Sequence, residues 1–104
     1  MIAMEETKQF KELPPVVLQA VPVTGYKVHA YMNDGTIHLF DAWPMILSGE
    51  VFEPLKNSRV FADSLTVINE TVAWDLSGDR DPGKCIDVDP YTIMESPIVN
   101  DPSL

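Results

Sequence analysis

The sequence predicts a small α+β protein, a single domain with a mostly antiparallel sheet of about five strands and two or three short helices. A length of 104 residues suits one compact core. Nine prolines restrict helix interiors and favour strands and turns. Strand-like runs surround a group of short helical segments, which is typical of α+β domains. We expect residues 16–96 to form the domain, with residues 1–15 a flexible extension and residues 97–104 a disordered tail.

The first half of the domain is expected to hold three strands. Residues 16–23 (VVLQAVPV) form an apolar run, and its Pro22 favours an edge position or a strand end. Residues 27–32 and 36–41 flank Asn33-Asp34-Gly35, a tip that supplies the positive φ of a hairpin turn. Alternation places Ile37 and Leu39 on one face of the second arm, with His38 and Phe40 on the other. The sequence therefore predicts a β-hairpin over residues 27–41.

Short helices are expected next, over residues 42–47 and from residue 51 to about residue 62. Asp41 is placed to cap the first helix, and Pro44 fits its first turn. The two-residue connection Asn69-Glu70 joins a further pair of strands. The two strands are expected over residues 65–68 and 71–74. A loop over residues 77–83 and a last helical turn over residues 90–95, capped by Asp89, are expected to follow.

The formal net charge of −9 restricts the classes of partner. Residues 1–62 carry seven acidic and five basic side chains, whereas residues 63–104 carry nine acidic and two basic ones. An acidic surface repels phosphates, which argues against direct nucleic-acid binding and against an anionic membrane. A small basic protein would be attracted to it. Solubility alone is the alternative explanation of the charge.

Several features indicate a cytoplasmic protein. Cys85 is the only cysteine, so an internal disulfide is excluded and a reducing compartment is favoured. No apolar run approaches the roughly 20 residues needed to span a bilayer. The first residues, MIAMEETKQFKEL, lack the basic-then-apolar order of a signal peptide.

The stretch GDRDPGKC runs from Gly78 to Cys85. Its first seven residues match G-x-x-x-x-G-K, the start of a phosphate-binding loop. Such a loop directs a helix N-terminus at the phosphates, but the following IDVDP alternates polar and apolar residues and meets a proline. Cys85 stands where a serine or threonine would ligate magnesium. Asp79 and Asp81 place negative charge inside the cradle. We therefore expect a plain surface loop and no nucleotide.

The remaining chemistry-bearing residues form no recognisable site. Five carboxylates gather late in the chain without the spacing of a calcium loop, which predicts a solvated acidic loop and a helix cap. His29 and His38 can approach each other across the hairpin, but no third or fourth metal ligand is evident. Lys84 beside Cys85 would lower the pKa of the thiol, although no partner base is evident. We expect no cofactor, no metal and no catalytic residue.

Large apolar residues near the short helices are expected mostly to pack against the sheet. They are Trp43, Phe52, Leu55, Phe61 and Trp74. An exposed member of this group would mark a partner surface. The candidate interaction surface combines three of these aromatic residues with four carboxylates: Trp43, Phe52, Trp74, Asp79, Asp81, Asp87 and Asp89.

The order of several short motifs is similar to that of a bacterial family. The motifs are Asp34-Gly35, Leu39-Phe40-Asp41, Gly49-Glu50-Val51-Phe52, Pro54-Leu55, Thr71-Val72-Ala73-Trp74 and Asp87-Val88-Asp89-Pro90. In this combination the chain resembles, over about residues 16–95, the proteins of domain of unknown function 2442 (DUF2442). The resemblance implies a compact α+β fold and no established activity. It also implies, for some relatives, a neighbouring small protein in a layout like a toxin–antitoxin pair.

These observations favour a non-enzymatic protein-interaction module, the antitoxin-like partner of a small basic protein. The alternative is a small-ligand-binding or regulatory domain with a pocket lined by Trp43, Phe52 or Trp74. An enzyme would need a site assembled from scattered Asp, His and Tyr residues. Exposed strand edges leave a homodimer open.

Overall fold

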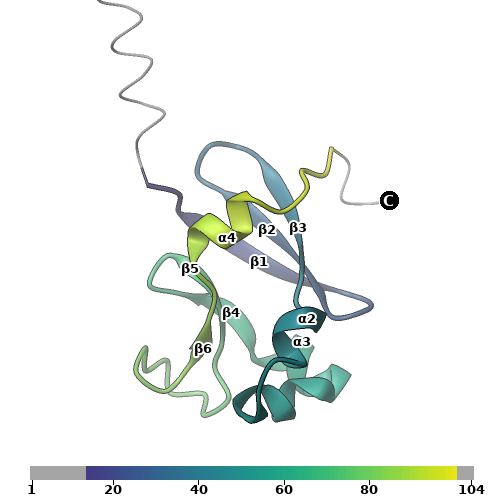
Figure 1. Ribbon diagram of the computed structural model, residues 1–104. Helices are drawn as coiled ribbons and strands as arrows, with labels where there is room; N and C mark the ends of the chain where they lie inside the picture. The colour runs from purple at the N-terminus through teal and green to yellow at the C-terminus, as the bar shows by residue number, and fades with distance from the viewer. Residues whose placement is uncertain (1–13, 101–104) are drawn as a thin grey trace, which may run out of the picture.

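Two three-stranded antiparallel sheets and four short helices make up residues 14–100, the part of the chain that the computed structural model describes (Figure 1). The first sheet has the order β1 (Val17–Val23), β2 (Lys27–Met32), β3 (Ile37–Asp41). The second has the order β4 (Leu65–Ile68), β5 (Thr71–Trp74), β6 (Ile86–Asp87). The helices are α2 (Trp43–Ile46), the 3-10 helix η1 (Glu50–Lys56), α3 (Ser58–Ser64) and α4 (Pro90–Met94).

The α+β class is confirmed, but the expectation of about five strands in one sheet is wrong. The chain leaves β3 through α2, η1 and α3, and β4 then starts a second ladder rather than extending the first. A sixth strand, β6, is added by pairing of Ile86 with Trp74 and of Asp87 with Ala73. Two residues are too short for a periodic pattern, so only the neighbouring β5 reveals this strand.

The β2–β3 hairpin is confirmed, and its register decides which face enters the core. Ala30 pairs with His38 and Val28 with Phe40, and all four side chains are buried. His29 instead pairs with Leu39, so it lies on the opposite face of the sheet from His38. The two histidines therefore do not face each other, which removes the pairing considered from the sequence.

The Asn69-Glu70 turn joins the two sheets as well as the two strands β4 and β5. Both residues have positive φ, 52° and 65°, which matches the twist that a two-residue hairpin needs. The carbonyl oxygen of Glu70 accepts a hydrogen bond from the Val17 N–H of β1 at 2.8 Å. This main-chain bond fixes the start of β1 against the tip of the second sheet.

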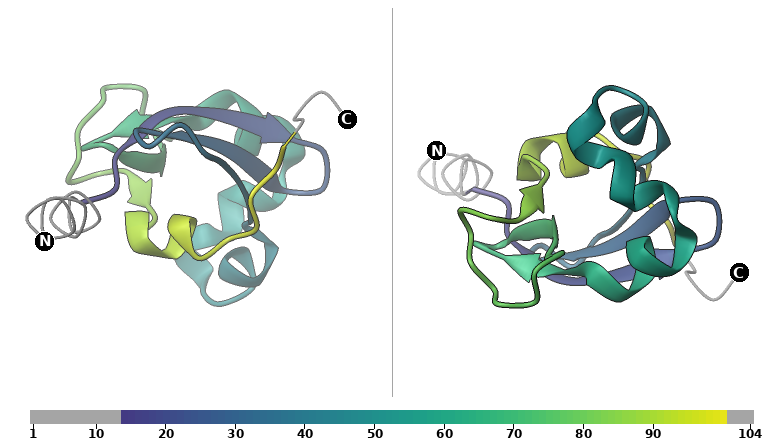
Figure 2. Two further views of the ribbon diagram at one scale, coloured as in Figure 1. Left: turned by 90° about the horizontal axis from the view of Figure 1, so that it is seen from above. Right: turned by 90° about the horizontal axis from the view of Figure 1, so that it is seen from below.

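The core lies between the sheets and the helices. Its fully buried side chains include Trp74, Ile46, Leu55, Ile93, Val17, Val28 and Val72. The Phe61 ring lies 5.3 Å from the Trp74 ring and 5.4 Å from the Tyr26 ring, which connects α3 to both sheets. Figure 2 shows β1 and α4 on opposite sides of the molecule, so the core is covered from both. No helix within residues 14–100 has the length and apolar character needed to cross a membrane.

The chain beyond α4 lies against β3 as an additional extended segment. The Leu39 N–H donates to the Pro97 carbonyl at 2.8 Å, and the Val99 N–H donates to the Ile37 carbonyl at 2.8 Å. The expectation of a disordered tail is therefore wrong for residues 97–99, which cover the outer edge of β3. The remainder of the expected extension and tail falls largely on residues 1–13 and 101–104, outside the described residues.

The caps of the short helices agree with the sequence in part. Asp89 caps α4 as expected, since its carboxylate accepts the Tyr91 N–H at 2.9 Å. Asp41 accepts the Trp43 N–H at 3.0 Å, but the residue that directly precedes α2 is Ala42. The predicted cap is thus displaced by one residue. The second helical region divides at Asn57, whose side chain caps α3.

Candidate interaction surface

The residues expected to form one interaction surface lie in three separate parts of the fold. Trp43 and Phe52 belong to the helices after β3, and the four carboxylates lie in and around the segment from β5 to α4. Trp74 is fully buried, because β5 is the central strand of its sheet and all its residues face protein. Trp74 therefore belongs to the core and not to any surface.

Three exposed apolar side chains form what we call the apolar ridge: Trp43, Leu47 and Val51. Their side chains are 37%, 58% and 66% exposed. Trp43 and Leu47 are four residues apart, so they project from the same side of α2 and its C-terminal end, and Val51 follows in η1. Phe52 is half-buried and packs against the core. Leu47 and Val51 were not anticipated, because a helix of four residues is too short to reveal its exposed face by periodicity.

Buried residues in and next to α2 and the side chain of Tyr26 hold the apolar ridge on the core. Ile46 and Ala42 are buried, which fixes α2 on the core. The Tyr26 ring lies 4.8 Å from the Trp43 ring, and the Tyr26 hydroxyl donates to the Lys56 carbonyl at the end of η1. Contacts of this kind orient the Trp43 side chain although much of one face stays open to solvent.

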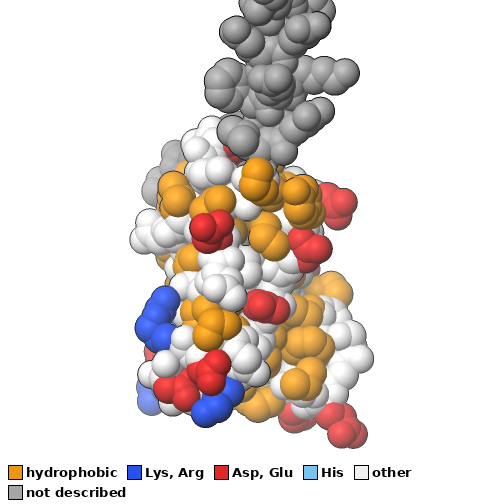
Figure 3. Space-filling model, turned by 90° about the vertical axis from the view of Figure 1, so that its left-hand side faces the viewer, with side chains coloured by type: hydrophobic (Ala, Val, Ile, Leu, Met, Phe, Trp, Pro, Cys, Tyr) orange, Lys and Arg blue, Asp and Glu red, His pale blue; other side chains and the backbone are white. Residues whose placement is uncertain are grey.

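Three exposed carboxylates border the apolar ridge, and we call them the carboxylate rim: Asp41, Glu50 and Glu53. Glu53 forms an ion pair with Lys56 at 3.0 Å. Within residues 14–100, Asp41 and Glu50 have no ion-pair partner. In Figure 3 orange side chains gather at the lower right, where α2 and η1 lie, with red carboxylates directly below them.

The acidic loop after β5 uses its carboxylates to build itself. Asp75 accepts the main-chain N–H groups of Gly78 at 3.0 Å and Arg80 at 2.9 Å. Asp79 accepts the Ser77 hydroxyl at 2.7 Å and the Asp81 N–H at 3.2 Å. These donors, Ser77 first, hold the pKa of the Asp79 carboxyl below its usual value. The loop is therefore an ordered structure rather than a loose acidic tail.

Backbone N–H groups of this loop point at its own side chains. The Gly83 N–H donates to the Asp81 carboxylate at 2.8 Å, just as other N–H groups of the loop donate to Asp75 and Asp79. A phosphate cradle needs such N–H groups free to bind the ligand. The guanidinium of Arg80 donates to the Thr66 hydroxyl at 3.1 Å and to the Val67 carbonyl at 2.8 Å. Arg80 thus anchors the loop on β4 and does not point at an anion.

Cys85 is half-buried at the end of this loop, and its thiol contacts the Pro82 carbonyl at 3.4 Å. Burial, and then the nearby Asp87 carboxylate, raise the pKa of the thiol. The expectation that Lys84 would lower this pKa is wrong, because the Lys84 ammonium lies against Asp79 at 3.3 Å. The un-ionised thiol is therefore favoured over the thiolate in this environment.

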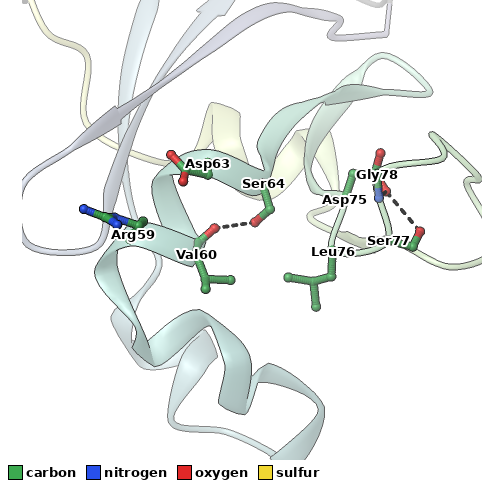
Figure 4. Close-up of a pocket in the computed structure, with 8 residues that line it drawn as sticks. All are labelled: Arg59, Val60, Asp63, Ser64, Asp75, Leu76, Ser77 and Gly78. Carbon is green, nitrogen blue, oxygen red and sulfur yellow. Dashed lines mark hydrogen bonds between the residues drawn. The ribbon is translucent and has the colours of Figure 1, made fainter.

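Two of the shallow hollows on the surface of residues 14–100 lie beside α3. One, of about 350 Å³, lies between α3 and the segment after β5, and the other, of about 330 Å³, lies between α3 and the β1–β2 turn. Figure 4 shows the side chains of Val60 and Leu76 facing each other in the first hollow, whereas Asp63 points away from it. Neither hollow is lined by the tryptophans or the phenylalanine expected to form a ligand pocket. Residues 14–100 contain no group of three His, Cys, Asp or Glu side chains placed to hold a metal.

Comparison of the chain with protein-family models, with curated proteins and with solved structures gives no match.

Proposed function

We propose that this chain is a non-enzymatic protein-interaction module that acts in the cytoplasm and binds a small basic protein. The observation that carries the proposal is the imbalance of surface charge. Residues 14–100 carry twelve acidic and five basic side chains, and only two ion pairs join them. Exposed carboxylates without a basic neighbour produce a negative potential that attracts a basic partner and speeds its association.

The resemblance to DUF2442 proteins supports the same proposal. The toxin–antitoxin-like layout implied for some of those proteins would make this chain the acidic, antitoxin-like member of a pair. The absence of a recognisable catalytic motif from the sequence fits a role in binding rather than catalysis.

The test is recovery of the partner at two salt concentrations. The tagged full chain is incubated with host lysate at about 50 mM and about 500 mM NaCl, which shortens the screening length roughly threefold. Recovered proteins are identified by mass spectrometry, and the complex is rebuilt from purified components for calorimetry. We expect one small basic protein whose affinity falls as salt rises. A rebuilt complex that ignores salt, or the absence of any partner, would contradict the proposal.

A small-ligand-binding function is the second candidate, favoured by the hollow beside Val60 and Leu76. Its volume of about 350 Å³ lies at the lower end of the range for ligand sites. A thermal-shift screen with a metabolite panel tests this function, with Leu76→Arg as the variant that fills the hollow. A ligand that stabilises the wild-type chain and not Leu76→Arg would support it. Equal stabilisation of both chains would place the ligand elsewhere.

A further inference from the structure

We propose that the apolar ridge and the carboxylate rim together form the docking surface for the basic partner. The partner segment that fits this surface presents aliphatic or aromatic side chains between lysine or arginine side chains. The inference rests on the proposed function and specifies the surface and the chemistry that it recognises.

The apolar ridge is the part of the chain in which exposed apolar side chains are most closely spaced. Seven large hydrophobic side chains within residues 14–100 are exposed, and three of them come from the nine consecutive residues 43–51. The other four come from different parts of the chain: Leu18 on β1, Leu76 after β5, Tyr91 on α4 and Ile98 beyond it. Single exposed hydrophobic side chains are ordinary, whereas a gathered group marks a partner site. Tryptophan is also enriched at the energetic centres of interfaces.

The packing beneath Trp43 favours binding without reorganisation of this side chain. The Tyr26 ring supports Trp43 at 4.8 Å, and the buried Ile46 holds α2 against the core. A surface whose side chains are already ordered loses less conformational entropy on association. Trp43 is therefore suited to act as a preformed anchor within the apolar ridge.

Charge around the apolar ridge selects the occupant. The carboxylate rim has three acidic side chains. Lys56 forms an ion pair with Glu53, and Lys27 lies opposite Asp41 in the β2–β3 register without an ion pair to it, so the rim keeps a negative excess. A second copy of this chain docked on the same surface would bring two such rims into one interface, which like-charge repulsion opposes. A partner with lysine or arginine beside its apolar anchor instead complements the rim. The surface therefore fits a basic protein segment better than a self-association contact.

Defined peptides provide the probe for this surface. The first peptide is helical and amphipathic, with leucines on one face flanked by lysines and arginines. The second keeps the leucines and carries glutamate at every basic position, and the third keeps the basic residues and carries serine for leucine. Binding to the full 15N-labelled chain is followed by amide chemical shifts. We expect only the first peptide to bind, with shifts centred on residues 41–53.

Matched variants separate this surface from the rest of the molecule. Leu47→Ser removes an apolar side chain from the ridge, and Leu18→Ser removes an equally exposed one from β1 (58% and 65% exposed). Glu50→Lys and Glu95→Lys change the net charge equally, but only the first alters the carboxylate rim. We expect Leu47→Ser and Glu50→Lys each to weaken binding of the first peptide by about tenfold, and the two control variants to leave it nearly unchanged.

Each other outcome overturns a defined part of the inference. Equal binding of the acidic peptide would refute the role of the carboxylate rim. Absence of binding, or shifts centred outside residues 41–53, would refute the docking surface. If a salt-sensitive partner were still recovered equally by the wild-type chain and by Leu47→Ser, the proposed function would stand and the surface assignment would fail. Self-association that Leu47→Ser abolishes would make the apolar ridge a homodimer contact instead.

Discussion

The imidazole Nδ1 of His38 lies 2.7 Å from the main-chain carbonyl oxygen of Ser96, which ties β3 to the segment that follows α4. A carbonyl oxygen can only accept, so Nδ1 carries the hydrogen. The other ring nitrogen, Nε2, lies 3.0 Å from the Thr36 hydroxyl, which itself bonds to the Asp34 carboxylate. Polar contacts therefore extend from the hairpin tip to the segment beyond α4, and the hydrogen bond from His38 to Ser96 is the link that crosses the fold.

The first prediction concerns this connection. His38→Ala should destabilise the fold by about 2–4 kcal/mol, because it removes the hydrogen bond to Ser96 and leaves a cavity where the buried imidazole packs. Hydrogen exchange should become faster at the Leu39 and Val99 amides, which pair β3 with residues 97–99. Urea denaturation and amide exchange measure the two effects. His29→Ala, on the opposite face of the sheet, is the control, and equal effects of both substitutions would show that the Ser96 contact is unimportant.

The second prediction concerns pH and Asp34. Hydrogen bonds from the Thr36 hydroxyl and the Thr36 N–H hold the pKa of the Asp34 carboxyl below its ordinary value of 3.8. The unfolded chain therefore binds more protons than the folded chain near this pH, so stability rises with pH there. The contribution of Asp34 is fully present above its ordinary pKa and is lost as pH falls through the lower folded pKa.

Asp34→Asn should therefore be less stable than the wild-type chain at neutral pH, and this difference should shrink below about pH 4. The effect should be small, because the carboxylate is exposed to solvent. Thermal unfolding between about pH 2 and pH 7 measures it, with the exposed α3 substitution Asp63→Asn as the control. A stability difference that stays constant over this range would contradict the assignment.

The third prediction concerns Asp75, which organises the loop after β5. Asp75→Ala should free the N–H groups of Gly78 and Arg80 and loosen the contact of Arg80 with β4. We expect a loss of about 1–3 kcal/mol, because two hydrogen bonds to a charged acceptor disappear. Backbone relaxation should show increased motion over residues 77–84. The control is Asp81→Ala, which removes one local main-chain bond, and a larger effect from that variant would contradict the prediction.

The fourth prediction concerns the indole of Trp74. Its Nε1–H is buried and has no hydrogen-bond partner among the described residues. Trp74→Phe removes this unsatisfied donor and leaves a small cavity, and the two effects oppose each other. We expect Trp74→Phe to cost less than about 2 kcal/mol and Trp74→Ala about 3–5 kcal/mol in urea denaturation. If Trp74→Phe destabilised the fold as much as Trp74→Ala, this result would indicate that the indole N–H makes a hydrogen bond in solution.

Local chemistry made much of the fold predictable. The Asn33-Asp34-Gly35 tip, the two strands around Asn69-Glu70 and the cap at Asp89 all depend on residues within a few positions of one another. Turn chemistry and alternation act over the same short range, so the sequence displays them directly. Pro22 predicted an edge position or a strand end, and it lies one residue before the end of β1, an edge strand.

The candidate surface was predictable only in part. Trp43 was identified because it is large, apolar and close to a helix, but the same criterion selected Trp74, which is buried. Leu47 and Val51 carry no local signal that distinguishes them from core residues. The acidic loop was recognised by composition, whereas the bonding of Asp75 and Asp79 to the loop itself depends on left-handed conformations at Gly78 and Arg80.

The α+β class, the hairpin and the acidic character depend on composition and on interactions between near neighbours, so they can be read from the amino-acid order alone. Four features appear only in the folded molecule: the strands divide into two sheets, β6 pairs with β5, residues 97–99 cover β3, and an apolar ridge stays exposed. These features depend on which distant segments meet, because strand pairing and burial are settled between such segments. An apolar side chain is equally suited to the core and to an interface, and the surrounding packing alone separates the two.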